Sequence, residues 1–267
     1  MNKIEKVAQK LIKRSYPKEQ FLALLEHLFG MEPEVVYQTL IAQGLPLAEK
    51  EGKIFLKTAK TPFVHQEFVV VDIETSGSKP YEAQVIEIGA IKFQGEHILD
   101  RFESFIYASE IPEYITKLTG IEQKDLNDAP SQKEVLIDFK KFLGDAVFVA
   151  HNVNFDYNFI SSKLEQLGLA RLANRKLCSI DLARKTIESE RYGLAFLNES
   201  LGINTAVSHR AYADALTAYK IMQMALKRVP KEIKTTEDLI AFSKKGKNRT
   251  KKSLAPKDKA VDKLSAQ

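Results

Sequence analysis

Two short apolar runs constrain the fold of this 267-residue chain more than any other feature. Residues 68–73 read Phe-Val-Val-Val-Asp-Ile, and residues 146–150 read Ala-Val-Phe-Val-Ala. Apolar, β-branched runs without alternating polar positions are typical of central strands whose two faces are both covered. The two runs therefore predict an α/β domain in which helices flank a sheet.

The pattern around these runs predicts how the domain is built. Further strands are expected at residues 85–93, 97–107 and 177–180, the first two joined by a turn at Gln94-Gly95. Helices are expected at residues 135–143, 155–167 and over most of 181–228. Strands come first, then strands alternate with helices, and then helices dominate, which favours a mixed sheet.

The chain is predicted to have three regions. Residues 1–61 form a small N-terminal helical domain, residues 66–230 the main domain, and residues 231–267 a basic C-terminal segment. The first region combines three helical patterns, the second of which ends at Gly30, with a short strand at residues 54–56. This combination is compatible with a winged-helix-like module and equally with a plain helical accessory domain.

The net charge of +5 is unevenly distributed along the sequence. Residues 231–267 contain eleven Lys/Arg and five Asp/Glu, a net +6, so the other 230 residues sum to −1. A basic end that is poor in aromatic residues is typical of partial disorder, which we expect past Gly246. Such a segment attracts polyanions, although solvated chain ends often have the same composition.

The composition favours a cytoplasmic protein. The single cysteine, Cys178, can form neither an internal disulfide nor a zinc cluster, and a small buried residue in a reducing compartment is expected. Residues 1–13 mix Lys and Glu with apolar residues and do not predict a signal peptide. The longest apolar runs are far too short to span a membrane, so no membrane contact is expected.

The first chemically informative element is Asp72-Ile73-Glu74-Thr75-Ser76-Gly77, at the end of the first apolar run. Residues two apart on a strand face the same side, so Asp72 and Glu74 project together. Two adjacent carboxylates repel each other, and a hard divalent cation such as Mg²⁺ or Mn²⁺ relieves that repulsion. An isolated Asp-x-Glu is also compatible with two solvated acids at a strand end.

Two further elements supply carboxylates and a histidine. Asp156 follows the second apolar run and falls in the first turn of the next helix, where it is also an ordinary partner of the helix dipole. His209 and Asp214 open the last long helix. A histidine titrates near neutral pH and is suited to activating water, although a lone histidine is often a surface or capping residue.

Together these elements resemble the three exonuclease motifs of the DEDD superfamily, histidine subtype. The matching motifs are Val-Asp-Ile-Glu-Thr-Ser-Gly, His-Asn-Val-Asn-Phe-Asp and His-x-x-x-x-Asp, in that order. Residues 86–90, Ile-Glu-Ile-Gly-Ala, also resemble that family's second strand. The resemblance covers about residues 68–228 and is closest to the proofreading (epsilon) subunit family of DNA polymerase III. It implies a ribonuclease H-like fold for the main domain, as an exonuclease domain.

The resemblance implies a role for each motif residue. Asp72 would bridge two Mg²⁺ or Mn²⁺ ions, Glu74 and Asp214 would bind the ion that carries the attacking water, and Asp156 would hold the second ion. His209 would be the general base. The product would be a nucleoside 5′-monophosphate.

The resemblance also implies residues that contact the substrate or support the site. Residues that would border the terminal nucleotide are Thr75, Ser76, Gly77, Thr119 and Ile121, the last two from a loop for which plain packing is an alternative. His151, in the second motif, would be structural and would cap the turn between strand and helix.

The implied role is proofreading, acting on DNA with a free 3′ end, with the polymerase III catalytic subunit and the sliding clamp as partners. An RNA-trimming exonuclease of the same superfamily and a catalytically silent binding module are the alternatives. About sixty residues precede the first motif, unlike in the smaller proofreading subunits.

Residues 235–242 are faintly similar to a clamp-binding peptide with Glu237 in place of the usual glutamine. A packed last helix that buries Leu239, Ile240 and Phe242 is the simpler interpretation. The Lys-rich end from Lys244 would attract the DNA backbone.

Overall fold

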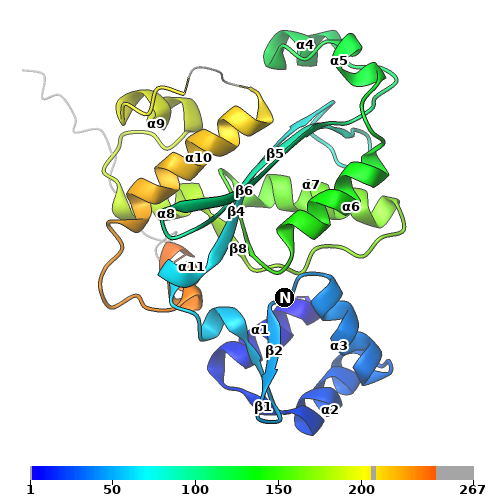
Figure 1. Ribbon diagram of the computed structural model, residues 1–267, viewed down its shortest axis with the longest axis vertical. Helices are drawn as coiled ribbons and strands as arrows, with labels where there is room; N and C mark the ends of the chain where they lie inside the picture. Colours follow the sequence, from blue (N-terminus) through cyan, green and yellow to red (C-terminus); the bar gives the residue numbers. More distant parts are fainter. Residues whose placement is uncertain (1, 206–208, 245–267) are drawn as a thin grey trace, which may run out of the picture.

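The computed structural model describes residues 2–205 and 209–244 (Figure 1). Its main domain is built on a five-stranded mixed sheet with the order β6-β5-β4-β7-β8. Strands β4, β5 and β6 are antiparallel neighbours, whereas β7 and β8 continue the sheet in parallel from β4. The strands are β4 Glu67–Thr75, β5 Val85–Gln94, β6 His97–Phe105, β7 Val147–Ala150 and β8 Lys176–Cys178.

The predicted α/β architecture is confirmed, because both faces of β4 are buried under helices. Val69, Val71 and Ile73 pack against α6 (Gln132–Leu143) and α7 (Val153–Gln166) on one face. Phe68 and Val70 pack on the other face. Helices on that second face are α8 Ser179–Thr186, α9 Leu194–Ser200, α10 Ala211–Leu226 and α11 Thr236–Lys244.

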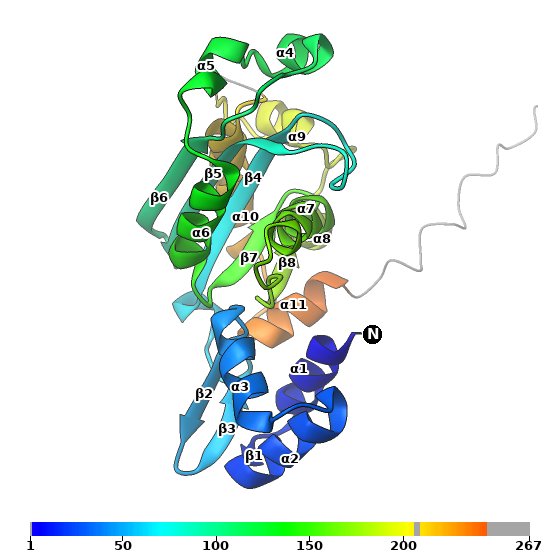
Figure 2. The same ribbon diagram turned by 90° about the vertical axis from the view of Figure 1, so that its right-hand side faces the viewer.

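A short helical arm projects from the end of the sheet beyond β6 (Figures 1 and 2). It consists of α4 (Glu113–Thr119) and α5 (Gln123–Asn127), which share a small apolar cluster with Ile86 of β5. The αL residue Gly120, with φ +71°, ends α4 and lets the chain turn back into α5.

The N-terminal domain has the order of elements of a winged helix. Its three-stranded antiparallel sheet has the order β1-β3-β2, and the three helices bury their apolar faces against one side of it. Gly30, with φ +69°, ends the second helix as predicted. Its elements are α1 Lys3–Lys13, β1 Tyr16–Pro17, α2 Lys18–Phe29, α3 Pro33–Ala42, β2 Leu47–Lys50 and β3 Lys53–Leu56. The short helices η1 (Lys57–Ala59) and η2 (Phe63–His65) lead from it into β4.

Several predicted boundaries are corrected. The strand expected at residues 177–180 is Lys176–Cys178, because Ser179 already begins α8. The strand expected to reach residue 107 ends at Phe105. Cys178 is half-buried rather than buried. The sequence interpretation missed β1 and β2, which are too short and too polar to show a clear alternating pattern.

The segment after residue 230 is folded as far as Lys244. Thr235 bridges to Pro62 in the linker, and α11 buries Leu239 and Ile240 in the main core. This is the packed helix that the simpler interpretation predicts. Residues 245–267, for which disorder and attraction to DNA are expected, lie outside the described residues, as do residues 206–208.

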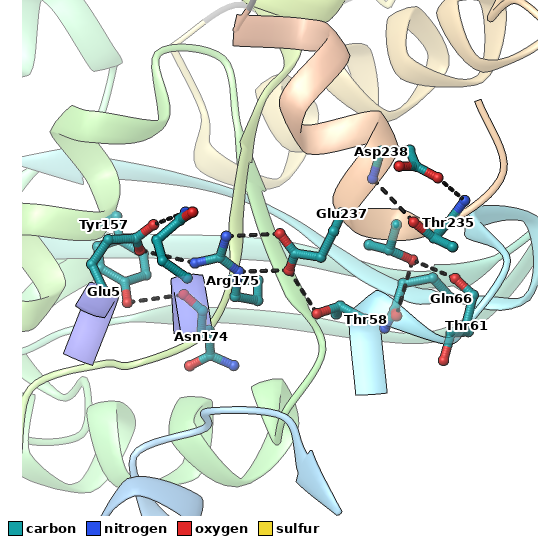
Figure 3. Close-up of polar contacts among 12 residues, drawn as sticks. Glu5, Thr58, Thr61, Gln66, Tyr157, Asn174, Arg175, Thr235, Glu237 and Asp238 are labelled. Atoms are coloured by element: carbon teal, nitrogen blue, oxygen red, sulfur yellow. Dashed lines mark hydrogen bonds and ion pairs between the residues drawn. The ribbon is translucent and has the colours of Figure 1, made fainter. Parts of the chain in front are cut away.

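One buried arginine joins the N-terminal domain, the main domain and α11 (Figure 3). Arg175, 6% exposed, donates from Nε and Nη2 to the two carboxylate oxygens of Glu237 at 2.7 and 2.8 Å, and from Nη1 to Glu5 at 2.9 Å. Thr58 donates its hydroxyl to the same Glu237 carboxylate at 2.7 Å. The three regions are therefore connected by charge-assisted hydrogen bonds.

Across residues 2–205 and 209–244, the helices are all too short or too polar to cross a membrane.

Candidate active site

The first two carboxylates project from β4 toward the helix α10. Asp72 and Glu74 alternate with Val71 and Ile73, which are buried on the α6–α7 face, so both acids lie on the opposite face. Both side chains are half-buried near the carboxyl end of the strand.

A glycine on β5 allows α10 to reach this face. Gly89 is the register partner of Asp72. A Cβ atom built on Gly89 would lie 2.2 Å from the amide nitrogen of Tyr212 and 2.4 Å from the carbonyl carbon of Ala211, far inside contact distance. The first turn of α10 therefore packs directly on the β5 backbone, which only glycine permits. This approach brings Asp214, in that first turn, to the carboxylates of β4.

A buried glutamate fixes the start of α10 and was not singled out by the sequence analysis. Glu87 on β5 is 1% exposed and accepts hydrogen bonds from Arg210 Nη2 at 2.9 Å and from the backbone amide of Ala211 at 3.0 Å. It thereby satisfies an unpaired amide of the helix end. A charged residue inside the apolar run Ile86-Glu87-Ile88 is the signal that could have identified it.

His209 and Asp214 meet Glu74 at the exposed side of the site. One ligand atom from each of these three residues lies within 4.8 Å of the other two. The backbone amide of His209 donates to Asp214 Oδ2 at 3.0 Å. His209 has a left-handed backbone (φ 60°), and its side chain is exposed.

Asp156 completes the set from the first turn of α7, as predicted. Its side chain is only 4% exposed, and it lies near enough to Asp72 for the two charges to interact. Asn152, in a left-handed conformation (φ 95°), precedes the helix and makes the sharp turn from β7 into α7. The structure thus brings together Asp72, Glu74, Asp156, Asp214 and His209, from three separate segments.

Burial raises the pKa of each of these carboxylates, and neighbouring acids raise those of Asp72 and Glu74 further. Burial, followed by the charges of Asp156 and Asp214, raises the pKa of Asp72 well above its usual range. Burial, with Asp214 as the next cause, raises the pKa of Glu74 to about 8. Burial raises the pKa of Asp156 to about 7, opposed by backbone hydrogen bonds, and it also raises the pKa of Asp214. The nearby Arg210 lowers the pKa of Glu74 but is engaged by Glu87.

These residues fit a site for hard divalent cations. Oxygen ligands from four carboxylates are the donor set that Mg²⁺ and Mn²⁺ prefer. Burial and neighbouring acids disfavour the ionised forms of these carboxylates, and bound cations would stabilise those forms.

Metal binding is expected to strengthen as pH rises. Folding raises the pKa of Glu74 from 4.5 to about 8 and that of Asp156 from 3.8 to about 7, so the folded metal-free protein holds protons that the unfolded chain has lost. The stability of the metal-free protein therefore falls as pH rises from the unfolded pKa values to the folded ones, that is, up to about pH 8. Mg²⁺ displaces those protons, so it should raise Tm more at about pH 8.5 than at about pH 6.

This dependence can be measured by scanning calorimetry with and without Mg²⁺. Calorimetric titration in buffers of different ionisation enthalpy should also show proton release on binding. An equal rise in Tm at the two pH values, without proton release, would contradict the assignment.

The residues predicted to border the terminal nucleotide differ in accessibility. Thr75, Ser76 and Gly77 are half-buried beside the carboxylates. The Tyr114 hydroxyl of α4 donates to the Ser76 carbonyl at 3.4 Å, so the arm lies directly over this loop.

Thr119 and Ile121 are buried inside the arm. The Thr119 hydroxyl donates to the Ile115 carbonyl at 2.9 Å and accepts from the Ile121 amide at 3.1 Å, while Ile121 is 1% exposed. These contacts favour the packing alternative, and a nucleotide contact by either residue stays a prediction. The large apolar side chains that are exposed on this arm are Tyr114 and Leu118.

His151 is bound at both ring nitrogens. Nε2 lies 2.8 Å from the Tyr192 carbonyl, and Nδ1 lies 2.8 Å from the Ser179 hydroxyl. Burial lowers the pKa of His151, which favours the neutral ring that donates from Nε2 and accepts at Nδ1. The side chain ties the loop before α9 to the start of α8, a structural arrangement that leaves no free nitrogen for catalysis.

Comparisons with known proteins identify the family of the main domain. Residues 69–222 match the RNase T family, described as exonuclease. The chain belongs to this exonuclease family. It is thus a member of the DEDD superfamily of 3′–5′ exonucleases, as the sequence motifs predict.

Curated relatives include the PolC-type DNA polymerase III of Staphylococcus saprophyticus and of Staphylococcus aureus. Each is 37% identical over 204 residues, which cover 75% of this chain. The chain spans only 13% of the length of these relatives.

Solved structures of nucleases share the fold. Escherichia coli exonuclease I in complex with a dA16 oligonucleotide has a TM-score of 0.57 at 16% identity, covering 62% of this chain and 42% of the other. Exonuclease X in complex with 5′-overhanging duplex DNA has a TM-score of 0.50 at 20% identity, covering 66% and 99%. At these identities the likeness concerns the fold alone.

Proposed function

We propose that this exonuclease-family protein removes nucleotides from the 3′ end of DNA by metal-dependent hydrolysis and releases nucleoside 5′-monophosphates. The observation that carries the proposal is the convergence of four carboxylates and an accessible histidine at one end of the sheet. All the ionisable residues of the three motifs are present, which argues against a catalytically silent binding module.

Each side chain has a task in this reaction. Asp72, Glu74, Asp156 and Asp214 would hold two Mg²⁺ or Mn²⁺ ions. The ions would neutralise charge on the scissile phosphate and lower the pKa of the attacking water. His209, accessible and close to Glu74 and Asp214, would take the proton from that water.

Two further groups of residues would support the reaction. Thr75, Ser76 and Gly77 would border the terminal nucleotide, because they continue the strand that carries Asp72 and Glu74. Glu87 and Arg210 would act indirectly, because they hold the helix turn that carries Asp214.

A role in replication is supported by the relatives. The two staphylococcal relatives are named DNA polymerase III, and the solved structures of exonuclease I and exonuclease X with this fold are complexes with DNA. We therefore propose proofreading, with the polymerase III catalytic subunit as a partner and a cytoplasmic location that follows from this role. We propose the sliding clamp as a partner only through a segment other than α11, because Glu237 and Leu239 are buried in that helix.

The decisive experiment is cleavage of 5′-labelled DNA and RNA oligonucleotides of matched sequence in the presence of Mg²⁺. We expect a ladder of products that shortens from the 3′ end and faster decay of DNA. Faster decay of RNA would favour the RNA-trimming alternative. Absence of cleavage of either substrate would contradict the enzymatic assignment.

His209→Ala is expected to lower kcat by about 10²–10⁴-fold, the usual contribution of a positioned acid–base group. The variant retains all four carboxylates that would hold the cations, so Mg²⁺ binding measured by titration should persist. His151→Ala is the matched control: it should lower Tm while retaining most of the activity of the folded enzyme. A larger loss of kcat in His151→Ala than in His209→Ala would indicate that His151, in the second motif, is the general base.

A further inference from the structure

The outer face of the N-terminal sheet carries lysines around one aromatic ring. Ile54 and Leu56 of β3 point to the helices and are fully buried, so the alternating residues Lys53 and Phe55 point to the other side. Lys50 of β2 is the direct register partner of Lys53. Figure 2 shows the three helices of this domain on one side of the strands.

These residues line an open hollow of about 340 Å³. We call this surface the lysine face; it consists of Ser15, Lys50, Glu51, Lys53, Phe55 and Lys60. The three lysines are exposed, whereas Phe55 is half-buried.

The lysine face contains three lysines and one acid, Glu51, so it keeps a net positive charge. Lys18 pairs with Glu49, and Lys57 pairs with Asp145. Ion pairs to Lys50, Lys53 and Lys60 are absent within the part of the chain that the structure describes. Like charges directly opposite each other across two strands are destabilising, so a bound polyanion would relieve a cost that is built into the fold.

The helix α3, which corresponds to the recognition helix of a helix-turn-helix, is unsuited to a DNA groove. Residues 31–44 contain no Lys or Arg, and they include Glu32 and Glu34 at the start of the helix. The positive charge of a phosphate-contacting surface lies instead on the sheet.

We propose that the lysine face binds a single-stranded segment of DNA, with phosphates against the three lysines and a base stacked on Phe55. Aromatic rings next to basic side chains bind single strands, because an unpaired base exposes its face for stacking. The choice of DNA as the nucleic acid rests on the proposed function, whereas the binding surface itself is inferred from the lysine face alone. It places a second DNA contact in a different domain from the carboxylate site.

The first test uses Phe55→Trp as a reporter, because the chain has no native tryptophan. An oligothymidylate of about 30 nucleotides, added to the full-length protein in excess chelator, should quench the fluorescence of this single tryptophan by stacking. Blunt duplex DNA of the same length should quench it much less. Unchanged fluorescence at saturation, or equal quenching by duplex, would overturn the proposal.

The second test measures affinity by fluorescence anisotropy under the same conditions. The double variant Lys50→Gln/Lys53→Gln lacks two positive charges and should bind about tenfold more weakly at low salt. A plot of the logarithm of the association constant against the logarithm of the salt concentration should have a slope that is smaller in magnitude by about 1.4. The matched control is Lys6→Gln/Lys10→Gln on α1, which changes the net charge equally and should leave the slope nearly unchanged. Equal losses in the two variants would show that net charge alone attracts DNA.

Both tests are independent of catalysis, because binding is measured in excess chelator. A gel verifies that the DNA remains intact during the measurement. Retained binding without nuclease activity would contradict the proposed function and leave this inference standing. Circular dichroism and melting curves of each variant establish that the N-terminal domain remains folded.

Discussion

Asp72→Asn is expected to lower exonuclease activity by several orders of magnitude, and excess chelator should do the same to the wild type. The substitution retains the shape of the side chain but removes the charge that lies at the centre of the cluster. Asp72 interacts with Asp156, Asp214 and Glu74, so its loss would affect both of the proposed cation positions. Cleavage of 5′-labelled single-stranded DNA over time provides the measurement.

The variant should nevertheless fold at least as well as the wild type when metal is absent. Burial and like charges raise the pKa of Asp72, which means that the ionised side chain is held at a cost. Asparagine removes that cost, so Tm in chelator should stay equal or rise while activity is lost. Undiminished cleavage in excess chelator would refute a metal-dependent mechanism. A fall in both Tm and activity would assign Asp72 a structural role.

The spatial convergence of the site residues was predictable because they lie in short motifs. Strand alternation alone places Asp72 and Glu74 on one face, and the apolar run before Asp156 predicts the strand that delivers it. The predicted catalytic and metal-binding residues do meet in the structure. The residues that position the site were less predictable. Glu87 fixes the start of α10 through a bond to Arg210, which lies 123 positions away in the sequence.

The central fold was predictable for a similar reason, whereas the contacts between regions were not. Uninterrupted apolar runs identify β4 and β7 because both faces of each strand are buried. The apolar residues Leu239 and Ile240 indicate α11 within a basic segment, but they do not reveal that Glu237 of the same helix pairs with Arg175. Such pairings join distant segments and leave no periodic pattern in the sequence.

Arg175→Met is expected to lower the free energy of unfolding by about 3–5 kcal/mol, because it leaves a buried carboxylate without its partner. Glu237 is 6% exposed, and among the described residues its carboxylate would retain the hydroxyl of Thr58 as its one hydrogen-bond donor. Urea denaturation of the full-length protein gives the measurement. The loss should appear as a lower midpoint with an unchanged slope if the folded state remains compact.

Two controls separate this buried pair from ordinary surface charge. Glu96→Ala removes an exposed partner of Lys227, with side chains 70% and 65% exposed, and should cost at most about 1 kcal/mol. Arg175→Met/Glu237→Leu replaces both charges by apolar groups and should recover much of the stability lost in the single variant. A single-variant loss as small as that of Glu96→Ala would show that the Arg175 network does not hold the three regions together. Failure of the double variant to recover would instead indicate that Glu5 and Thr58 also depend on the arginine, since both belong to the same network.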